Sequence, residues 1–159
     1  MVINLEGTMK KIISVFLVLG LIAPAFADTR EEIKNLVVQD LAYLQKNLKG
    51  PPEQLSSKGS LEFWSSGGLL VDNRSTEERF ETFTGTAKHI EVVVLVEGEA
   101  AVAQFYQEAV MKPVNSGLVS NYRARVTQVF VNEDGRWKIA AAHYSPLVGG
   151  AGTSQVVVK

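Results

Sequence analysis

Apolar residues recur at helical spacing along residues 29–49, after a polar start. Thr29 precedes Glu32 by three positions, which is the capping-box arrangement found at many helix N-termini. Gly50 and the two prolines after it end the pattern, because glycine favours a helix C-terminus and proline cannot continue a helix. The spacing predicts one long amphipathic helix, from Thr29 to Lys49. Its apolar stripe consists of Ile33, Leu36, Val37, Leu41, Leu44 and Leu48.

Shorter elements are predicted after this helix. Leu61–Trp64 and Leu69–Val71 have the composition of two short strands, with a Ser-Ser-Gly-Gly turn between them. Residues 75–83 begin with a second capping pattern, in which Ser75 precedes Glu78 by three positions. This segment is therefore predicted to form a second helix.

The rest of the chain has the pattern of long strands. The last two are joined by Asn132 to Gly135, whose Asp-Gly pair is typical of tight hairpins. Strands that follow one another after the helices favour an α+β fold with an antiparallel sheet. We expect the long strands to curve over the first helix and enclose a pocket, within one domain at 28–147 followed by a flexible tail at 148–159. The predicted strands cover residues 89–97, 100–111, 119–131 and 136–146.

The N-terminus has the pattern of a secretory signal peptide. A short basic start precedes an apolar run over residues 12–22, and Ala25–Ala27 supplies the small residues required for cleavage before Asp28. The apolar run is shorter than the roughly 20 residues needed to span a bilayer, which argues against a stable membrane anchor. We expect residues 1–27 to be removed and the protein to be periplasmic or secreted.

Composition narrows the possible functions. The chain has 159 residues with 16 basic and 17 acidic side chains, so it lacks the basic surface with which proteins bind nucleic acids. The absence of cysteine excludes disulfides, thiolate nucleophiles and cysteine-ligated metals. Two histidines do not support a multi-histidine metal centre, and no dinucleotide or phosphate-binding glycine motif is present. We therefore expect no metal and no cofactor.

Asp40 falls inside the arc of the predicted apolar stripe, near its middle. Carboxylates are rarely buried without a partner, because removing a charge from water is costly. In one interpretation Asp40 is a pocket acid or base whose pKa is raised by apolar surroundings. In the other it is a structural acceptor for loop amides or a tyrosine hydroxyl. We expect His143, Tyr43 or Tyr106 to lie within reach of it.

Other residues are candidates on the strands and at the pocket wall. Alternation places His143 on the same strand face as Ile139, where it is either a general base or an ordinary core histidine. His89 opens a strand and is expected to be exposed. A solvated or dimer-facing sheet surface is the favoured interpretation for Arg123, Arg125 and Glu108, and an anion site is the alternative. Four aromatic residues either line a ligand pocket or belong to the core: Tyr43, Trp64, Tyr106 and Tyr122.

Three segments resemble the nuclear transport factor 2-like superfamily. They are FWSSGG at 63–68, ERF at 78–80 and, most specifically, VFVNEDGRWKIAAAHYS at 129–145. The chain is most similar to the SnoaL-like branch and to the association domain of calcium/calmodulin-dependent kinases, over residues 29–147. The resemblance implies a cone-shaped, cystatin-like α+β roll, commonly dimeric, with a long N-terminal helix packed on a curved, mainly antiparallel sheet. It also implies a pocket between helix and sheet, toward which the histidine of the final strand, His143, points.

Two functions are compatible with these features. The first is a non-catalytic pocket or oligomerisation module that binds a small amphipathic ligand. The alternative is an enzyme similar to ketosteroid isomerases, cyclases or dehydratases, with Asp40 and His143 as acid and base. Because Glu108 is the only obvious second acid in the strands, we favour the module. A sheet larger than the helices can cover also predicts a homodimer through its outer face.

Overall fold

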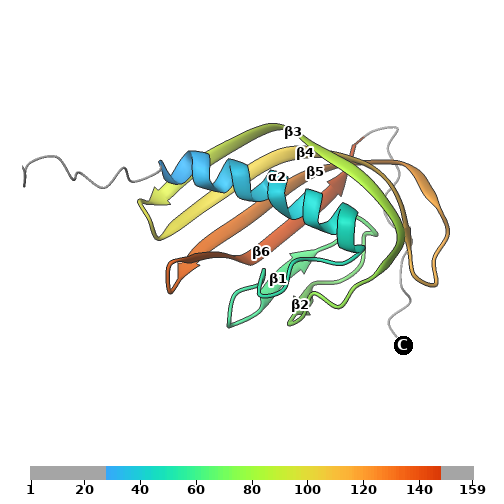
Figure 1. The fold of residues 1–159 in the computed structure, drawn as a ribbon, viewed down its shortest axis with the longest axis horizontal. Coiled ribbons are helices and arrows are strands. Elements are labelled where there is room, and N and C mark those ends of the chain that lie inside the picture. The colour runs from blue at the N-terminus through green and yellow to red at the C-terminus, as the bar shows by residue number, and fades with distance from the viewer. Residues whose placement is uncertain (1–27, 148–159) are drawn as a thin grey trace, which may run out of the picture.

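The computed structural model describes residues 28–147 (Figure 1). The predicted signal peptide and tail, 1–27 and 148–159, lie outside the described residues. Within the described part, one long helix, α2, covers Thr29–Asn47. The strands are β1 (Ser60–Phe63), β2 (Val71–Asn73), β3 (Phe80–Val96), β4 (Ala100–Pro113), β5 (Val119–Glu133) and β6 (Arg136–Pro146).

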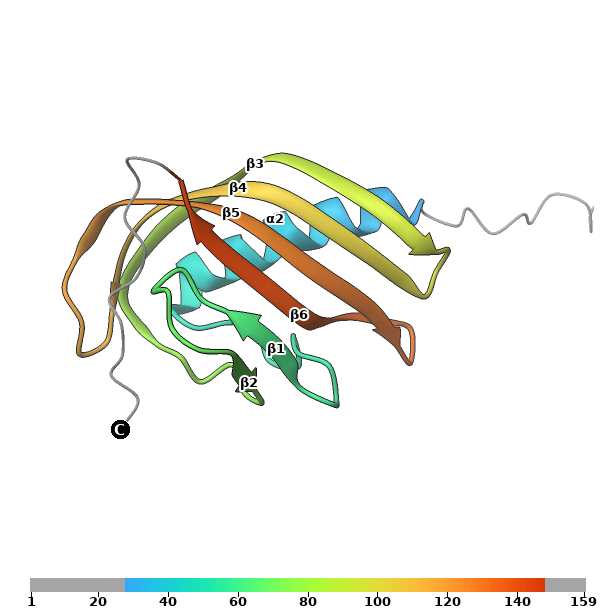
Figure 2. The same cartoon turned by 180° about the vertical axis from the view of Figure 1, so that it is seen from behind.

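These strands form a single sheet in the order β2-β1-β6-β5-β4-β3. All neighbours are antiparallel except β1 and β6, which run parallel. The sheet curves around α2, which lies across its concave face and packs mainly on β3 (Figures 1 and 2). The predicted α+β class, a long helix on a curved and mainly antiparallel sheet, is confirmed.

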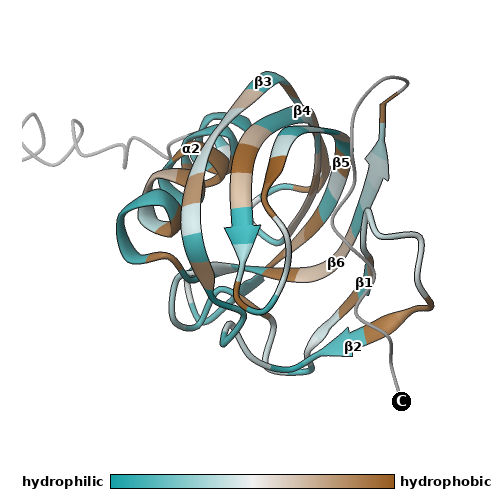
Figure 3. Ribbon diagram, turned by 90° about the vertical axis from the view of Figure 1, so that its right-hand side faces the viewer, coloured by the Kyte–Doolittle hydropathy of each residue, from teal (hydrophilic) through white to brown (hydrophobic). Residues whose placement is uncertain are grey.

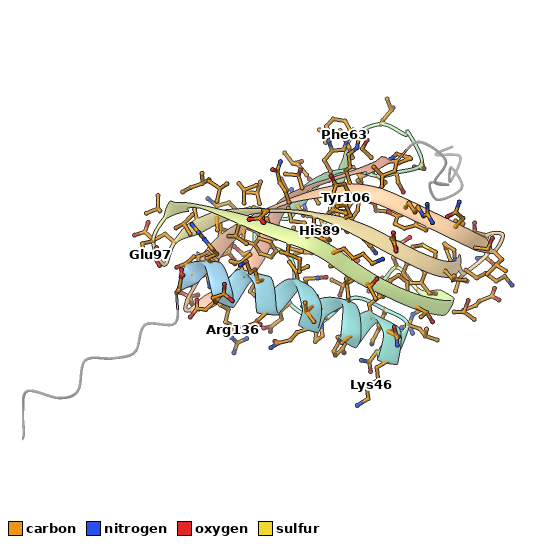
Figure 4. All side chains as sticks on the ribbon, turned by 90° about the horizontal axis from the view of Figure 1, so that it is seen from above. Lys46, Phe63, His89, Glu97, Tyr106 and Arg136 are labelled. Atoms are coloured by element: carbon orange, nitrogen blue, oxygen red, sulfur yellow. The ribbon has the colours of Figure 1, made fainter. Side chains whose placement is uncertain are left out.

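The first turn of α2 is attached to the turn between β3 and β4. Asp28 is the N-cap, and its carboxylate accepts a hydrogen bond of 3.0 Å from the backbone N–H of Arg30. Thr29 is buried; its hydroxyl donates to the Glu97 carboxylate and accepts from Gly98 N at 3.1 Å. Figure 4 shows Glu97 beside the start of the helix. These contacts fix where the helix crosses the sheet.

The C-terminal end of α2 and the segment before β3 both differ from their sequence-based predictions. The helix ends at Asn47 and not at Lys49. Its C-cap, Leu48, has a left-handed conformation with φ of 58° and takes the role expected of Gly50. The second helix predicted for residues 75–83 is wrong. β3 begins at Phe80, whose N–H donates to Leu48 O at 2.9 Å, and the residues before it form a loop. Pairing of β3 with β4 along its length outweighs the local capping pattern. No helix of the described residues is long and apolar enough to cross a membrane.

The hairpin between β5 and β6 matches its prediction. Asp134 and Gly135 both have positive φ, 53° and 78°, as a two-residue turn that follows the twist of its strands requires. Hydrophobic and hydrophilic bands alternate along β3, β4 and β5 (Figure 3). The inward residues of this alternation form the core with the buried face of α2. The largest core side chains include Ile33, Phe83, Phe105, Met111, Val126 and Phe130.

A β-bulge interrupts the pairing of β5 with β6. Val129 pairs with Ala141, whereas the next residue, Phe130, pairs with Ile139, so Ala140 is an extra residue in β6. An inserted residue reverses which side chains face the core from that point on. Simple alternation along β6 therefore fails beyond the bulge, with consequences for the site.

Candidate functional site

A cavity of about 190 Å³ lies between α2 and the concave face of the sheet. The loop after α2, strand β1, the segment before β3 and the inner faces of β4, β5 and β6 complete its walls. Its apolar side includes Val37, Leu41 and Leu44 of the helix. Its aromatic lining consists of Trp64, Phe80, Phe83, Phe105, Tyr122 and Tyr144.

Asp40 lines this cavity from α2, as expected for an acid within the apolar stripe. Its Oδ2 accepts a hydrogen bond of 2.6 Å from Gln54 Nε2, in the loop that follows the helix. Burial raises the pKa of Asp40 to about 6, although the hydrogen bond from Gln54 works in the opposite direction. Its hydrogen-bond partner is thus an amide of the following loop, as the structural interpretation expected, and not His143, Tyr43 or Tyr106. Asp40 is therefore a half-buried carboxylate that changes charge close to neutral pH.

Glu62 is a second pocket acid, which the sequence analysis missed. It is only 6% exposed, and its Oε2 accepts hydrogen bonds from Trp64 Nε1 at 2.6 Å and Asn73 Nδ2 at 3.4 Å. Strand β1 presents Ser60 and Glu62 to the interior, whereas Leu61 is exposed. The sequence did contain an indication of this orientation. Residues two apart in a strand share a face, so an inward Trp64 implies an inward Glu62.

Glu78 is a third acid of the cavity lining, and this residue is exposed to solvent. The surrounding protein and the negative charge of Glu62 both raise the pKa of Glu78. Burial and the charge of Glu78 also raise the pKa of Tyr122, against a lowering hydrogen bond with Ser65. The pKa of Tyr144 is raised by burial and by Glu62. The acids and tyrosines of the cavity thus influence one another electrostatically.

Two buried amides add polar groups to the sheet side of the cavity. Gln128 is 8% exposed, and its Nε2 donates to Tyr144 Oη at 3.2 Å. Gln107 is 7% exposed and lines the same cavity. Among residues 28–147 its side-chain amide has no hydrogen-bond partner. Because Gln107 lines the cavity, its amide is available to a bound molecule.

The charges around the cavity have one sign. Asp40, Glu62 and Glu78 are among its lining residues, and no lysine, arginine or histidine is. None of the salt bridges between described residues involves these three carboxylates. No group of three or more acidic or histidine side chains in the described part of the chain is arranged to hold a metal ion.

Of the four aromatic residues predicted to line a pocket, two do so. Trp64 and Tyr122 face the cavity. Tyr43 is on α2 but outside the lining, with its carbonyl accepting from Asn47 Nδ2 at 2.8 Å. Tyr106 is 42% exposed on the outer face of the sheet. The sequence could not distinguish inner from outer aromatic residues on these elements.

The prediction that His143 faces the pocket is wrong. The extra residue at Ala140 reverses the alternation, so Ala142 and Tyr144 point inward and His143 is exposed on the outer face. The His143 ring lies edge-on to Phe63, with centroids 5.7 Å apart. Figure 4 shows Phe63 on the side of the sheet opposite α2. Asp40 and His143 therefore do not share a cavity.

The remaining charged candidates also lie on the outer face. His89 is exposed as expected, with its ring centroid 6.0 Å from that of Tyr106. Glu108 forms a salt bridge of 2.6 Å with Lys88, so it is not a pocket acid. Arg125 donates to Ser145 Oγ at 2.8 Å. These contacts agree with a solvated or dimer-facing sheet surface rather than an anion site.

The fold and the helix-covered pocket define the chain as an α+β roll of the nuclear transport factor 2-like superfamily. It belongs to the SnoaL-like family, whose domain model matches residues 62–149, more than half of the chain. The resemblance seen in the sequence is thereby confirmed. No curated protein sequence matches significantly.

Solved structures share this architecture. A nuclear transport factor 2-like protein from Cytophaga hutchinsonii has a TM-score of 0.60 at 17% identity, over 76% of this chain and 100% of that one. A similar protein of unknown function from Pseudomonas putida has a TM-score of 0.55 at 12% identity, over 81% and 96%. The calcium/calmodulin-dependent kinase II hub homology domain of Chlamydomonas reinhardtii has a TM-score of 0.53 at 17% identity, over 76% and 99%. At these identities the similarity shows the fold alone.

Proposed function

We propose that this chain is an exported, non-catalytic pocket protein that binds a small amphipathic molecule between α2 and the sheet. The cavity carries this proposal. It is a concave site with aromatic and aliphatic walls and a few polar groups from separate segments, which is the usual composition of small-molecule sites. Gln107 adds an amide that lines the cavity and has no hydrogen-bond partner among residues 28–147, so it is available to a bound molecule.

The outward position of His143 supports binding over the acid–base mechanism considered from the sequence. General acid–base catalysis requires both groups within hydrogen-bond reach of one substrate. Asp40 lines the cavity and His143 lies on the opposite face of the sheet. A mechanism that uses this pair is not proposed.

A second candidate function is an isomerase- or dehydratase-like enzyme with Asp40 as the pocket base. The observation that favours it is the pKa of Asp40, raised by burial to about 6, because a catalytic acid or base works best when its pKa is close to the working pH. Tyr122 and Tyr144 would supply neutral hydroxyl donors, since burial raises the pKa of both.

Export and self-association complete the proposal. The signal-peptide pattern of residues 1–27 supports a periplasmic or secreted location. Exposed apolar side chains on the outer sheet face, such as Phe63, Tyr106 and Val110, support a homodimer through that face.

A thermal-shift screen of small amphipathic molecules tests binding, since a molecule that binds the folded state raises Tm. Each hit is repeated with Asp40→Asn and with Glu99→Gln, an acid-to-amide control at the exposed turn after β3. The proposal expects hits weakened by Asp40→Asn only and recovered unchanged after incubation. Conversion of a hit by the wild-type protein but not by Asp40→Asn would establish the enzyme instead. The absence of any Asp40-dependent hit would contradict both functions.

A further inference from the structure

The charge of the cavity restricts the molecules that it can bind. Three lining carboxylates come from different parts of the chain: Asp40 from α2, Glu62 from β1 and Glu78 from the segment before β3. No cationic side chain of the described residues lines the cavity or forms a salt bridge with them. Carboxylates that line one cavity repel one another unless a cation or protons neutralise them.

Among the described residues, Glu62 is the clearest case of a cavity carboxylate without a cationic partner. It is 6% exposed and accepts hydrogen bonds from two neutral donors, the Trp64 indole and the Asn73 amide. Such bonds orient the carboxylate without neutralising it. In the segment before β3, Arg74 is paired with Asp72 at 2.6 Å and not with Glu62. The interior carboxylate therefore lacks a counter-charge from residues 28–147.

The walls of the cavity show what kind of cation suits it. Six aromatic residues line it, among them Trp64 and Tyr122, and the faces of aromatic rings attract cations while also accommodating apolar groups. A hydrated inorganic ion gains little from such walls. An ammonium group with an apolar substituent uses the carboxylates and the aromatic surface together. Gln107, whose amide has no partner within the described residues, supplies a carbonyl oxygen for an N–H donor.

We propose that the ligand of this pocket is a small organic cation, an amine or quaternary ammonium that carries an apolar or aromatic group. This inference rests on the proposed function, because it assigns a ligand class to the same binding pocket. It differs from that proposal in requiring a positive charge, which a generic amphipathic pocket does not.

Three compounds of similar size separate the charge requirement from pocket binding itself. They are 2-phenylethylammonium, 2-phenylethanol and phenylacetate, which are cationic, neutral and anionic near pH 7.5. The readout is the indole N–H signal of Trp64 in a two-dimensional NMR titration of the mature chain. We expect 2-phenylethylammonium to bind at least about tenfold more tightly than 2-phenylethanol, with no detectable binding of phenylacetate.

Glu78→Gln tests the carboxylates with little risk to folding, since Glu78 is open to solvent and forms no salt bridge among the described residues. It should weaken binding of the ammonium by at least about threefold and change that of the alcohol by less than about twofold. Glu99→Gln, outside the cavity lining, should change neither. Circular dichroism confirms that each variant is folded.

Each outcome has a defined meaning. Equal or tighter binding of the alcohol or the carboxylate at Trp64 would overturn the cation inference and leave the binding pocket standing. Displacement of the ammonium by millimolar calcium chloride would assign the site to an inorganic cation and also overturn the inference. A Trp64 signal that responds to none of the three compounds would contradict both the inference and the proposed function.

Discussion

Gln54 Nε2 donates a hydrogen bond of 2.6 Å to Asp40 Oδ2, which joins the loop after α2 to the acid in the apolar stripe of the helix. The backbone of Gln54 is held as well, because its carbonyl accepts from Ile139 N of β6 at 2.9 Å. The helix acid, the loop and the last strand thus form one hydrogen-bonded unit at the cavity wall. Burial nevertheless outweighs the hydrogen bond and raises the pKa of Asp40 to about 6.

The raised pKa predicts how Asp40 affects stability. The folded protein holds the Asp40 proton up to about pH 6, whereas the unfolded chain releases it near 3.8, so the stabilisation by protonated Asp40 is lost as pH rises between these values. The loss corresponds to at most about 3 kcal/mol. Asp40→Asn should remove this dependence and should be at least as stable as wild type at neutral pH.

Urea denaturation of both proteins near pH 4 and near pH 7.5 measures this effect as a change in the free energy of unfolding. The difference between variant and wild type should shift in favour of the variant at the higher pH. If Asp40→Asn is instead the less stable protein at neutral pH, the ionised carboxylate is a structural acceptor.

The outer face of the sheet should mediate dimerisation. Tyr106 is 42% exposed on β4, and a glutamate in its place would bring like charges together across a two-fold interface. Light scattering should give a dimer mass for wild type and a monomer mass for Tyr106→Glu. Leu69→Glu is the matched control, because Leu69 is 88% exposed in the loop between β1 and β2. A concentration-independent monomer mass for wild type would disprove the interface.

Thr29 should stabilise the folded protein through the contacts of its buried hydroxyl. Its hydroxyl joins the helix start to Glu97 and Gly98, and Thr29→Val would leave both of these groups without that partner. We expect a loss of about 1–3 kcal/mol in the free energy of unfolding. Thr84→Val, at an exposed position of β3, should change it by less than about 0.5 kcal/mol. Equal effects of the two substitutions would show that the buried contact is unimportant.

Export should leave Asp28 as the first residue. Cleavage there keeps the N-cap carboxylate that accepts from Arg30 N, as well as the buried Thr29. Expression of the complete chain in a Gram-negative host, followed by intact mass of the periplasmic fraction, should give a protein that lacks residues 1–27. Retention of the leader in that protein would refute the proposed location.

Strand periodicity, the hairpin Asp-Gly pair and the resemblance to a known superfamily were sufficient to predict the fold. The helix predicted at 75–83 failed because Phe80 and its successors pair with β4, a long-range interaction that a local capping pattern does not report. His143 was placed on the wrong face because the bulge at Ala140 leaves no mark in residue type.

The pocket acids show a different limit of sequence patterns. Asp40 was found because a charge within an apolar helical stripe is conspicuous. Glu62 was not, because the neighbouring Leu61 and Phe63 suggest that β1 buries its apolar side, whereas both are about half exposed at 52% and 47%. Only the position of Trp64, two residues on, indicated the true orientation.

The most direct test of the binding pocket uses the two tryptophans of the chain as internal reporters. Trp64 lines the cavity, and Trp137 lies outside it with its Nε1 donating to Glu32 Oε2 at 2.9 Å. The measurement is an NMR titration of both indole N–H signals with the hits of the thermal-shift screen. We predict a saturable shift of the Trp64 signal, an unchanged Trp137 signal, and the same dissociation constant within about twofold in His143→Gln, since that side chain lies across the sheet. Hits that leave the Trp64 signal unmoved, or that require His143 for binding, would contradict a ligand site between α2 and the sheet.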